Sequence, residues 1–170
     1  VINAFIPIFW TRELGTSPEQ GSFALTVFFS IGIFMTYIGG LLGDKYGPIK
    51  IIRLSLLVWL PAMFLLTEVP TFSPLIMMPI AYLLLLMIGA AKAISYSPVI
   101  VLGQTYLAKS IGFASGITLG VSQTIGGVIA PVVGNLADTY SLPVAMMTLV
   151  PFLVMGLGAS LILKDPKKLQ

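Results

Sequence analysis

The sequence predicts an all-α, polytopic transmembrane helix bundle, on the grounds of its composition and the spacing of its charges. Hydrophobic residues make up 57% of the 170 residues, charged residues make up 9%, and the mean hydropathy is +1.03. A soluble domain averages about 25% charged residues, which it needs to cover its surface. We therefore expect the lipid bilayer to surround most of this chain.

Residue types that the sequence lacks exclude several functions. There is no Cys and no His, which removes thiolate nucleophiles, zinc sites and imidazole acid–base catalysis. We expect no enzyme activity, no metal and no cofactor. The net charge of +3 comes from Lys and Arg scattered among apolar runs, so we also expect no nucleic-acid partner.

Charge-free intervals mark the membrane spans, because a bilayer core about 30 Å thick needs roughly 20 apolar residues of helix. One such interval separates Glu19 from Asp44. We predict one transmembrane domain over residues 1–170, with spans at about 1–12 (truncated), 21–43, 49–69, 74–104, 111–136 and 142–163. The fourth interval is long, and its end has an alternative interpretation as an interfacial turn around Ser97 and Pro98.

The basic residues predict the orientation, since Lys and Arg are retained on the cytoplasmic side. One set of connections, with the C-terminal tail, holds Lys45, Lys50, Arg53, Lys109, Lys164, Lys167 and Lys168. The opposite set holds Arg12 together with Glu13, Glu19, Glu68 and Asp138. We therefore predict an integral protein of the plasma (inner) membrane with its C-terminus in the cytoplasm.

Small residues recur every four residues along the fifth span. One row is Gly112, Gly116, Gly120 and Thr124, and a second is Gly126, Ala130 and Gly134, with Pro131 beside it. Such rows let helix backbones approach closely in lipid. We predict that they pack helices together; the alternative is a smooth face that slides during a conformational cycle.

The second span ends in a glycine-rich turn that carries a carboxylate. Its residues are Gly40, Leu41, Leu42, Gly43, Asp44, Lys45, Tyr46 and Gly47. This run resembles the cytoplasmic loop motif G-x-L-a-D-r-x-G of the major facilitator superfamily, although Pro48 and Ile49 stand where basic residues are expected. Gly47 permits a short turn, and the charge of Asp44 can meet a helix N-terminus or a basic side chain.

A fainter copy of the motif, residues 134–141 with Asp138, ends the fifth span. Its place on the opposite membrane face predicts an inverted three-plus-three helix repeat. The fifth span also resembles the eleventh helix of fosmidomycin-resistance-type and drug efflux members, and an antiporter motif with Ala130 in place of one Gly. We favour the C-terminal six-helix half of a twelve-helix transporter, with the N-terminal half as the alternative.

The resemblance implies that the first, second, fourth and fifth spans line a central cavity. The candidate lining residues are Asn3, Phe9, Tyr37, Lys92, Tyr96, Ser115, Thr118, Ser122 and Gln123. For most of them, a hydrogen bond between helices is the alternative. Lys92 lies near the middle of its span, where insertion of a charge costs about 2.5–3.5 kcal/mol. We expect it to face a wet cavity, bind an anionic substrate or pair with a carboxylate of the missing half; the alternative is that it reaches the cytoplasmic surface.

These features predict a proton- or ion-coupled secondary transporter that moves a small organic solute or drug by alternating access, in the efflux direction. Its partners would be the small-molecule substrate, a proton or other coupling ion, and the missing six-helix half. The alternative is a membrane scaffold or assembly protein that transports nothing. An intramembrane enzyme is disfavoured because the carboxylates lie at span ends.

Overall fold

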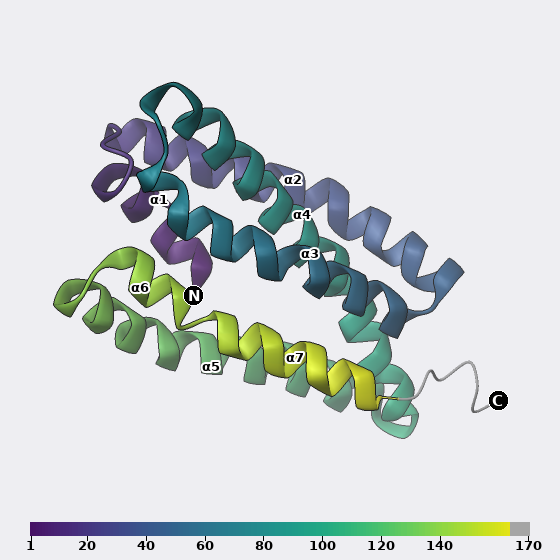
Figure 1. Ribbon diagram of the computed structural model, residues 1–170. Coiled ribbons are helices and arrows are strands. Elements are labelled where there is room, and N and C mark those ends of the chain that lie inside the picture. Colours follow the sequence, from purple (N-terminus) through teal and green to yellow (C-terminus); the bar gives the residue numbers. More distant parts are fainter. Residues whose placement is uncertain (164–170) are drawn as a thin grey trace.

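The structure is a computed structural model that describes residues 1–163, and within this range all of its regular elements are helices. In order they are α1 (Ile2–Arg12), α2 (Pro18–Tyr46), α3 (Pro48–Glu68), η1 (Val69–Thr71), α4 (Pro74–Tyr106), η2 (Ala108–Ser110), α5 (Ile111–Thr139), α6 (Leu142–Met147) and α7 (Val150–Ile162). Figure 1 shows α2, α3 and α4 running alongside one another, with α5, α6 and α7 along one side of the bundle. The predicted class, an all-α transmembrane helix bundle, is confirmed.

Five segments are long and apolar enough to cross a membrane: Pro18–Tyr46, Pro48–Thr71, Pro74–Tyr106, Ala108–Thr139 and Leu142–Ile162. Helix α1 has 11 residues and falls short of a span. Helix α4 continues through Ser97 and Pro98, where an interfacial turn was the alternative.

The last segment is two helices, where the sequence predicts one continuous span over 142–163. Helix α6 ends at Met147 and α7 begins at Val150. Pro151 lies in the first turn of α7, and a proline has no N–H for the preceding turn and crowds the carbonyl four residues earlier. The hydroxyl of Thr148 donates to the carbonyl of Ala145 at 2.6 Å within the break.

Local sequence sets the boundaries of α2. Ser17 caps its N-terminus in a capping box: its hydroxyl accepts from the N–H of Gln20, whose side chain accepts from the N–H of Ser17. At the other end Gly47 has φ 93°, a region that side chains with a Cβ rarely adopt, and Pro48 starts α3 at once. The predicted short turn between the second and third spans is therefore made by Gly47.

Helix α4 is the centre of the bundle, with α2 and α3 packed along it. The main core gathers around α1, where Phe9 and Trp10 are fully buried against residues of α3, α4 and α6. Helix α5 is different, because Ala114 and Val133 are its only buried residues in the described chain. It contacts α4 and α6.

Close helix contacts form at glycines of α2 and α4. A Cβ on Gly39 would meet the backbone of Ile94, with its Cα at 2.7 Å, and one on Gly43 would lie 3.1 Å from Cγ of Pro98. By contrast, Gly116, Gly120 and Gly134 of α5 have nothing within 4 Å of such a Cβ. Within the described residues, these three glycines of the rows therefore do not make that approach, and a Cβ on Gly126 would lie 4.0 Å from the backbone nitrogen of Val1.

Candidate functional site

Lys92 lies in the interior of α4, far from both ends of the helix. Its Nζ donates a hydrogen bond to Oδ1 of Asn3 on α1 at 2.9 Å, and lies 5.2 Å from the centre of the Phe28 ring on α2. Three helices thus meet at this ammonium group. The alternative in which Lys92 reaches the membrane surface is not the arrangement found here.

A cavity of about 260 Å³ opens beside Lys92, between α2 and α4. It is lined by Phe28, Phe29, Gly32, Ile33, Thr36, Gly89, Lys92, Ala93 and Tyr96. We call it the α2/α4 cavity. Of the residues predicted to line a cavity, it brings Lys92 and Tyr96 together, with Asn3 bonded to Lys92.

Sequence reasoning missed most of the wall of this cavity. Phe28 and Gly32, with Thr36 one turn further, follow a row at intervals of four along α2, and this row faces α4. The row was a usable signal. The aromatic side chain of Phe28 and the glycine at position 32 do not by themselves distinguish a cavity wall from a lipid contact in a membrane span.

Lys92 also lines a second cavity, of about 210 Å³, which lies among α1, α3, α4 and α7. Its other lining residues are Val1, Ile2, Trp59, Met63, Leu149, Phe152 and Leu153. The wall is almost entirely apolar, so Lys92 stands between two apolar spaces on either side of α4.

Two aromatic residues that were predicted to line a cavity, Phe9 and Tyr37, line neither of these two. Phe9 is fully buried in the core, with its ring 5.9 Å from that of Trp10, so it is a packing residue and does not line an open space. The rotation of α1 about its axis turns Phe9 toward the bundle. Tyr37 is 71% exposed and does not line the cavity that its neighbour Thr36 lines.

The four polar candidates on α5 lie apart from Lys92. Ser115 accepts a hydrogen bond from Nε2 of Gln104 at 2.9 Å, and Thr118 packs against Gly103, so both join α5 to α4. For these two, the alternative of a link between helices is the arrangement found. Ser122 and Gln123 are exposed.

The glycine-rich turn at the end of α2 is compact. A Cβ added to Gly40 would lie 3.3 Å from the hydroxyl oxygen of Ser97 on α4, and Gly43 packs against Pro98 of the same helix. Gly47, with its positive φ, forms the turn. Asp44 and Lys45 are exposed on the last turn of α2, with the Lys45 ammonium 5.1 Å from the Tyr46 ring. The turn thus holds the end of α2 against α4 and leaves its charges outward.

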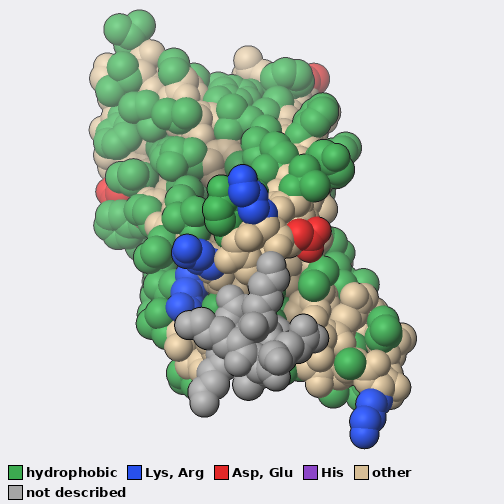
Figure 2. Space-filling model, turned by 90° about the vertical axis from the view of Figure 1, so that its right-hand side faces the viewer, with side chains coloured by type: hydrophobic (Ala, Val, Ile, Leu, Met, Phe, Trp, Pro, Cys, Tyr) green, Lys and Arg blue, Asp and Glu red, His purple; other side chains and the backbone are tan. Residues whose placement is uncertain are grey.

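Basic side chains gather at this end of the bundle, as Figure 2 shows. Here Arg53 on α3 donates to the carbonyl of Ser160 through Nε at 3.0 Å and Nη2 at 2.5 Å, and to that of Leu163 at 3.5 Å. The last carbonyls of a helix lack partners in their own helix, and a cation there is favourable. Arg53 thus caps α7. Lys164, Lys167 and Lys168 lie outside the described residues.

At the opposite end, Nη1 of Arg12 on α1 lies 3.2 Å from Oδ1 of Asp138 on α5. Both side chains are largely exposed. Asp138 belongs to the fainter copy of the loop motif, whose Ser141 caps α6 by accepting from the N–H of Val144. This ion pair joins the first helix to the fifth.

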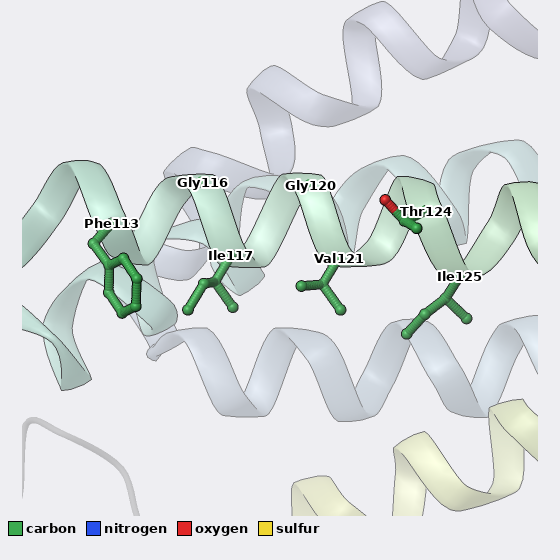
Figure 3. Close-up of a pocket in the computed structure, with 7 residues that line it drawn as sticks. All are labelled: Phe113, Gly116, Ile117, Gly120, Val121, Thr124 and Ile125. Carbon is green, nitrogen blue, oxygen red and sulfur yellow. The ribbon is translucent and has the colours of Figure 1, made fainter.

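One face of α5 forms an open apolar groove, which Figure 3 shows in close-up. Phe113, Ile117, Val121 and Ile125 project from the same side of the helix, and Gly116, Gly120 and Thr124 form the small-residue row beside them. All of these lining residues belong to α5, so within the described chain no other helix covers the groove.

Comparisons with known proteins identify the family of this chain. The sequence model of the Major Facilitator Superfamily matches residues 1–170. The MFS-type transporter YfnC of Bacillus subtilis (strain 168) is 31% identical over 166 residues, which is 98% of this chain and 39% of that protein. The fosmidomycin resistance protein of Escherichia coli (strain K12) is 28% identical over 141 residues, 83% of this chain and 33% of that protein. No solved structure matches significantly.

The chain thus spans between a third and two fifths of the length of these relatives. The family match covers the whole chain. The membrane-spanning helices and the turn at Gly47 are consistent with it. This chain belongs to the Major Facilitator Superfamily.

Proposed function

We propose that this chain is one six-helix half, the C-terminal one, of a secondary transporter that moves a small organic solute across the plasma membrane by alternating access. The observation that carries the proposal is Lys92, a cation in the middle of a spanning helix beside the α2/α4 cavity. A cation in the middle of a membrane span is costly, and such residues mark substrate or ion pathways in membrane proteins. A scaffold that transports nothing does not account for a cation at this position.

A partner half is supported by the uncovered faces of α2 and α5. Phe23, Phe34 and Tyr37 of α2 and Phe113 and Val128 of α5 are each at least 60% exposed. The relatives continue well beyond the matched region. In this superfamily two halves rock against each other around a midplane site, and these two helices would face the other half.

The proposal also includes the direction of transport, the coupling ion and the orientation in the membrane. The name of the Escherichia coli relative attaches fosmidomycin resistance to that protein, which supports export. The acidic residues of the spanning helices lie in their end turns, as do Glu19 and Asp44 of α2, so a proton-carrying carboxylate at membrane depth would belong to the other half. Lys45, Lys50 and Lys109 lie at the same end as the C-terminus of α7, which supports a cytoplasmic C-terminus.

The direct test is flux through the full-length protein in proteoliposomes. We expect labelled organic solutes to accumulate or leave against their gradient when a proton or ion gradient is imposed, and we expect no such flux in empty liposomes. A correctly inserted protein that moves no member of a broad solute panel under any gradient would support the scaffold alternative.

The loop motif gives a second, narrower test. We expect Asp44→Asn to lower flux while membrane insertion stays normal, because the carboxylate would hold one conformational state through a helix end or a cation of the other half. The matched control is Asp138→Asn, the same change in the fainter copy at the opposite end. Wild-type flux in Asp44→Asn would remove the role assigned to this residue.

A further inference from the structure

The ammonium of Lys92 is positioned without being neutralised. Within residues 1–163 it bonds to the amide oxygen of Asn3, and no carboxylate there forms an ion pair with it. An ammonium has three donors, so two remain for other acceptors. Because an amide oxygen is neutral, Asn3 fixes the direction of the charge and leaves the full charge available.

The space next to this charge is mostly apolar. Phe28, Phe29 and Ile33 supply hydrophobic walls, and the hydroxyl of Thr36 already donates to the carbonyl of Gly32 at 2.8 Å. Lys92 is therefore the charged group that the cavity offers to a ligand. In such surroundings, a ligand without anionic oxygens would leave two ammonium donors unsatisfied, and a cationic ligand would be repelled.

We propose that the Lys92 and Asn3 pair selects an organic anion as the substrate, with a carboxylate or similar oxyanion on a compact apolar body. Lys92 contacts the anionic oxygens, and Asn3 is a positioning residue that aims the ammonium. The apolar body lies against Phe28 and Phe29. This inference rests on the proposed function, because it assigns the α2/α4 cavity to the transported solute.

Asn3 is a sensitive point in this arrangement. A change of Asn3 to Asp keeps the shape and the acceptor atom but adds a negative charge in contact with Lys92. The pair then becomes neutral overall and loses its attraction for anions. A purely structural role for Asn3 would be preserved by this near-isosteric change, so Asn3→Asp separates the two roles.

The chain has no cysteine, which allows a direct measurement of charge in the cavity. Thr36→Cys places a thiol on the cavity wall of the full-length protein, in a background without other cysteines. Its reaction rate is measured with anionic sulfonatoethyl methanethiosulfonate and with cationic trimethylammonioethyl methanethiosulfonate, each divided by the rate with a free thiol. The ratio of the two normalised rates reports the local potential.

We expect the anionic reagent to be favoured in the otherwise unaltered protein, and the ratio to fall roughly tenfold in both Asn3→Asp and Lys92→Met. Lys92→Arg should keep the preference, because it retains the charge. A thiol that reacts with neither reagent, or a ratio that Asn3→Asp and Lys92→Met leave unchanged, would overturn the inference.

Flux of organic anions and of neutral analogues is measured in the same variants. We expect Asn3→Asp and Lys92→Met to weaken the apparent affinity for anions by roughly ten- to a hundredfold, and to lower the preference for anions over neutral analogues at least as much. Equal losses for both classes would contradict the role in selection. Absence of all flux would overturn the proposed function, whereas the thiol ratio would still report the potential at Lys92.

Discussion

Helices α2 and α5 are both long, both rich in glycine and both apolar, yet they use their glycines in opposite ways. On α2, Gly39 and Gly43 lie against α4 so closely that a Cβ would meet Ile94 or Pro98. On α5, Gly116 and Gly120 lie beside an open groove with nothing within reach. A row of small residues thus shows that a helix can be approached closely; the second helix must be identified from the structure.

The difference has a physical basis in what surrounds each helix. Lipid supplies no hydrophobic drive for helix association, so close contact depends on shape. Helix α2 finds its complement in α4 within this chain, where Gly89 in turn accepts Ile31 and Phe28. The groove on α5 has the same ridge-and-row form, with Phe113 and Ile117 beside Gly116, and it lacks a counterpart in the described residues.

The largest effect should come from Gly39→Ala. Its added methyl would meet the backbone of Ile94, which cannot move aside as a side chain can. We expect a loss of about 3 kcal/mol in the free energy of unfolding, at the upper end for overpacking, seen as a lower midpoint of thermal unfolding in detergent.

The matched control is Gly158→Ala on α7, a helical glycine with nothing within 4 Å. There, alanine should leave stability unchanged or raise it by up to about 1 kcal/mol, because alanine is the better helix former. Equal midpoints for Gly39→Ala and Gly158→Ala would show that α2 and α4 do not pack as closely as described.

Features that follow from local sequence were predictable in this protein, and contacts between distant residues were not. Five of the six expected spans coincide with helices long and apolar enough to cross a membrane, because hydropathy adds up along a helix and charges such as Asp44 and Glu68 interrupt it at the ends. The contact between Lys92 and Asn3 was not predictable, since it joins residues 89 positions apart. The burial of Phe9 was not predictable either, because periodicity gives the faces of α1 but not which of them turns toward the core.

An intermediate effect should come from Gly120→Leu, which tests whether the groove on α5 is covered in the full-length protein. If a helix of the other half lies on it, the leucine must displace that helix at a cost of about 1–3 kcal/mol. We expect a lower unfolding midpoint together with reduced flux. Gly158→Leu is the control, since its surroundings are equally open in this chain. Identical behaviour of the two leucine variants would mean that lipid, and not protein, covers the groove.

The smallest effect should come from the ion pair that joins α1 to α5. Arg12 and Asp138 are 62% and 74% exposed, and exposed pairs contribute about 0.2–1 kcal/mol, less in high salt. A double-mutant cycle of Arg12→Gln and Asp138→Asn, read by unfolding midpoints, isolates the coupling between the two charges. We expect it to be small and to vanish in molar salt. A coupling of several kcal/mol that persisted in salt would show that the full-length protein buries this end of α5.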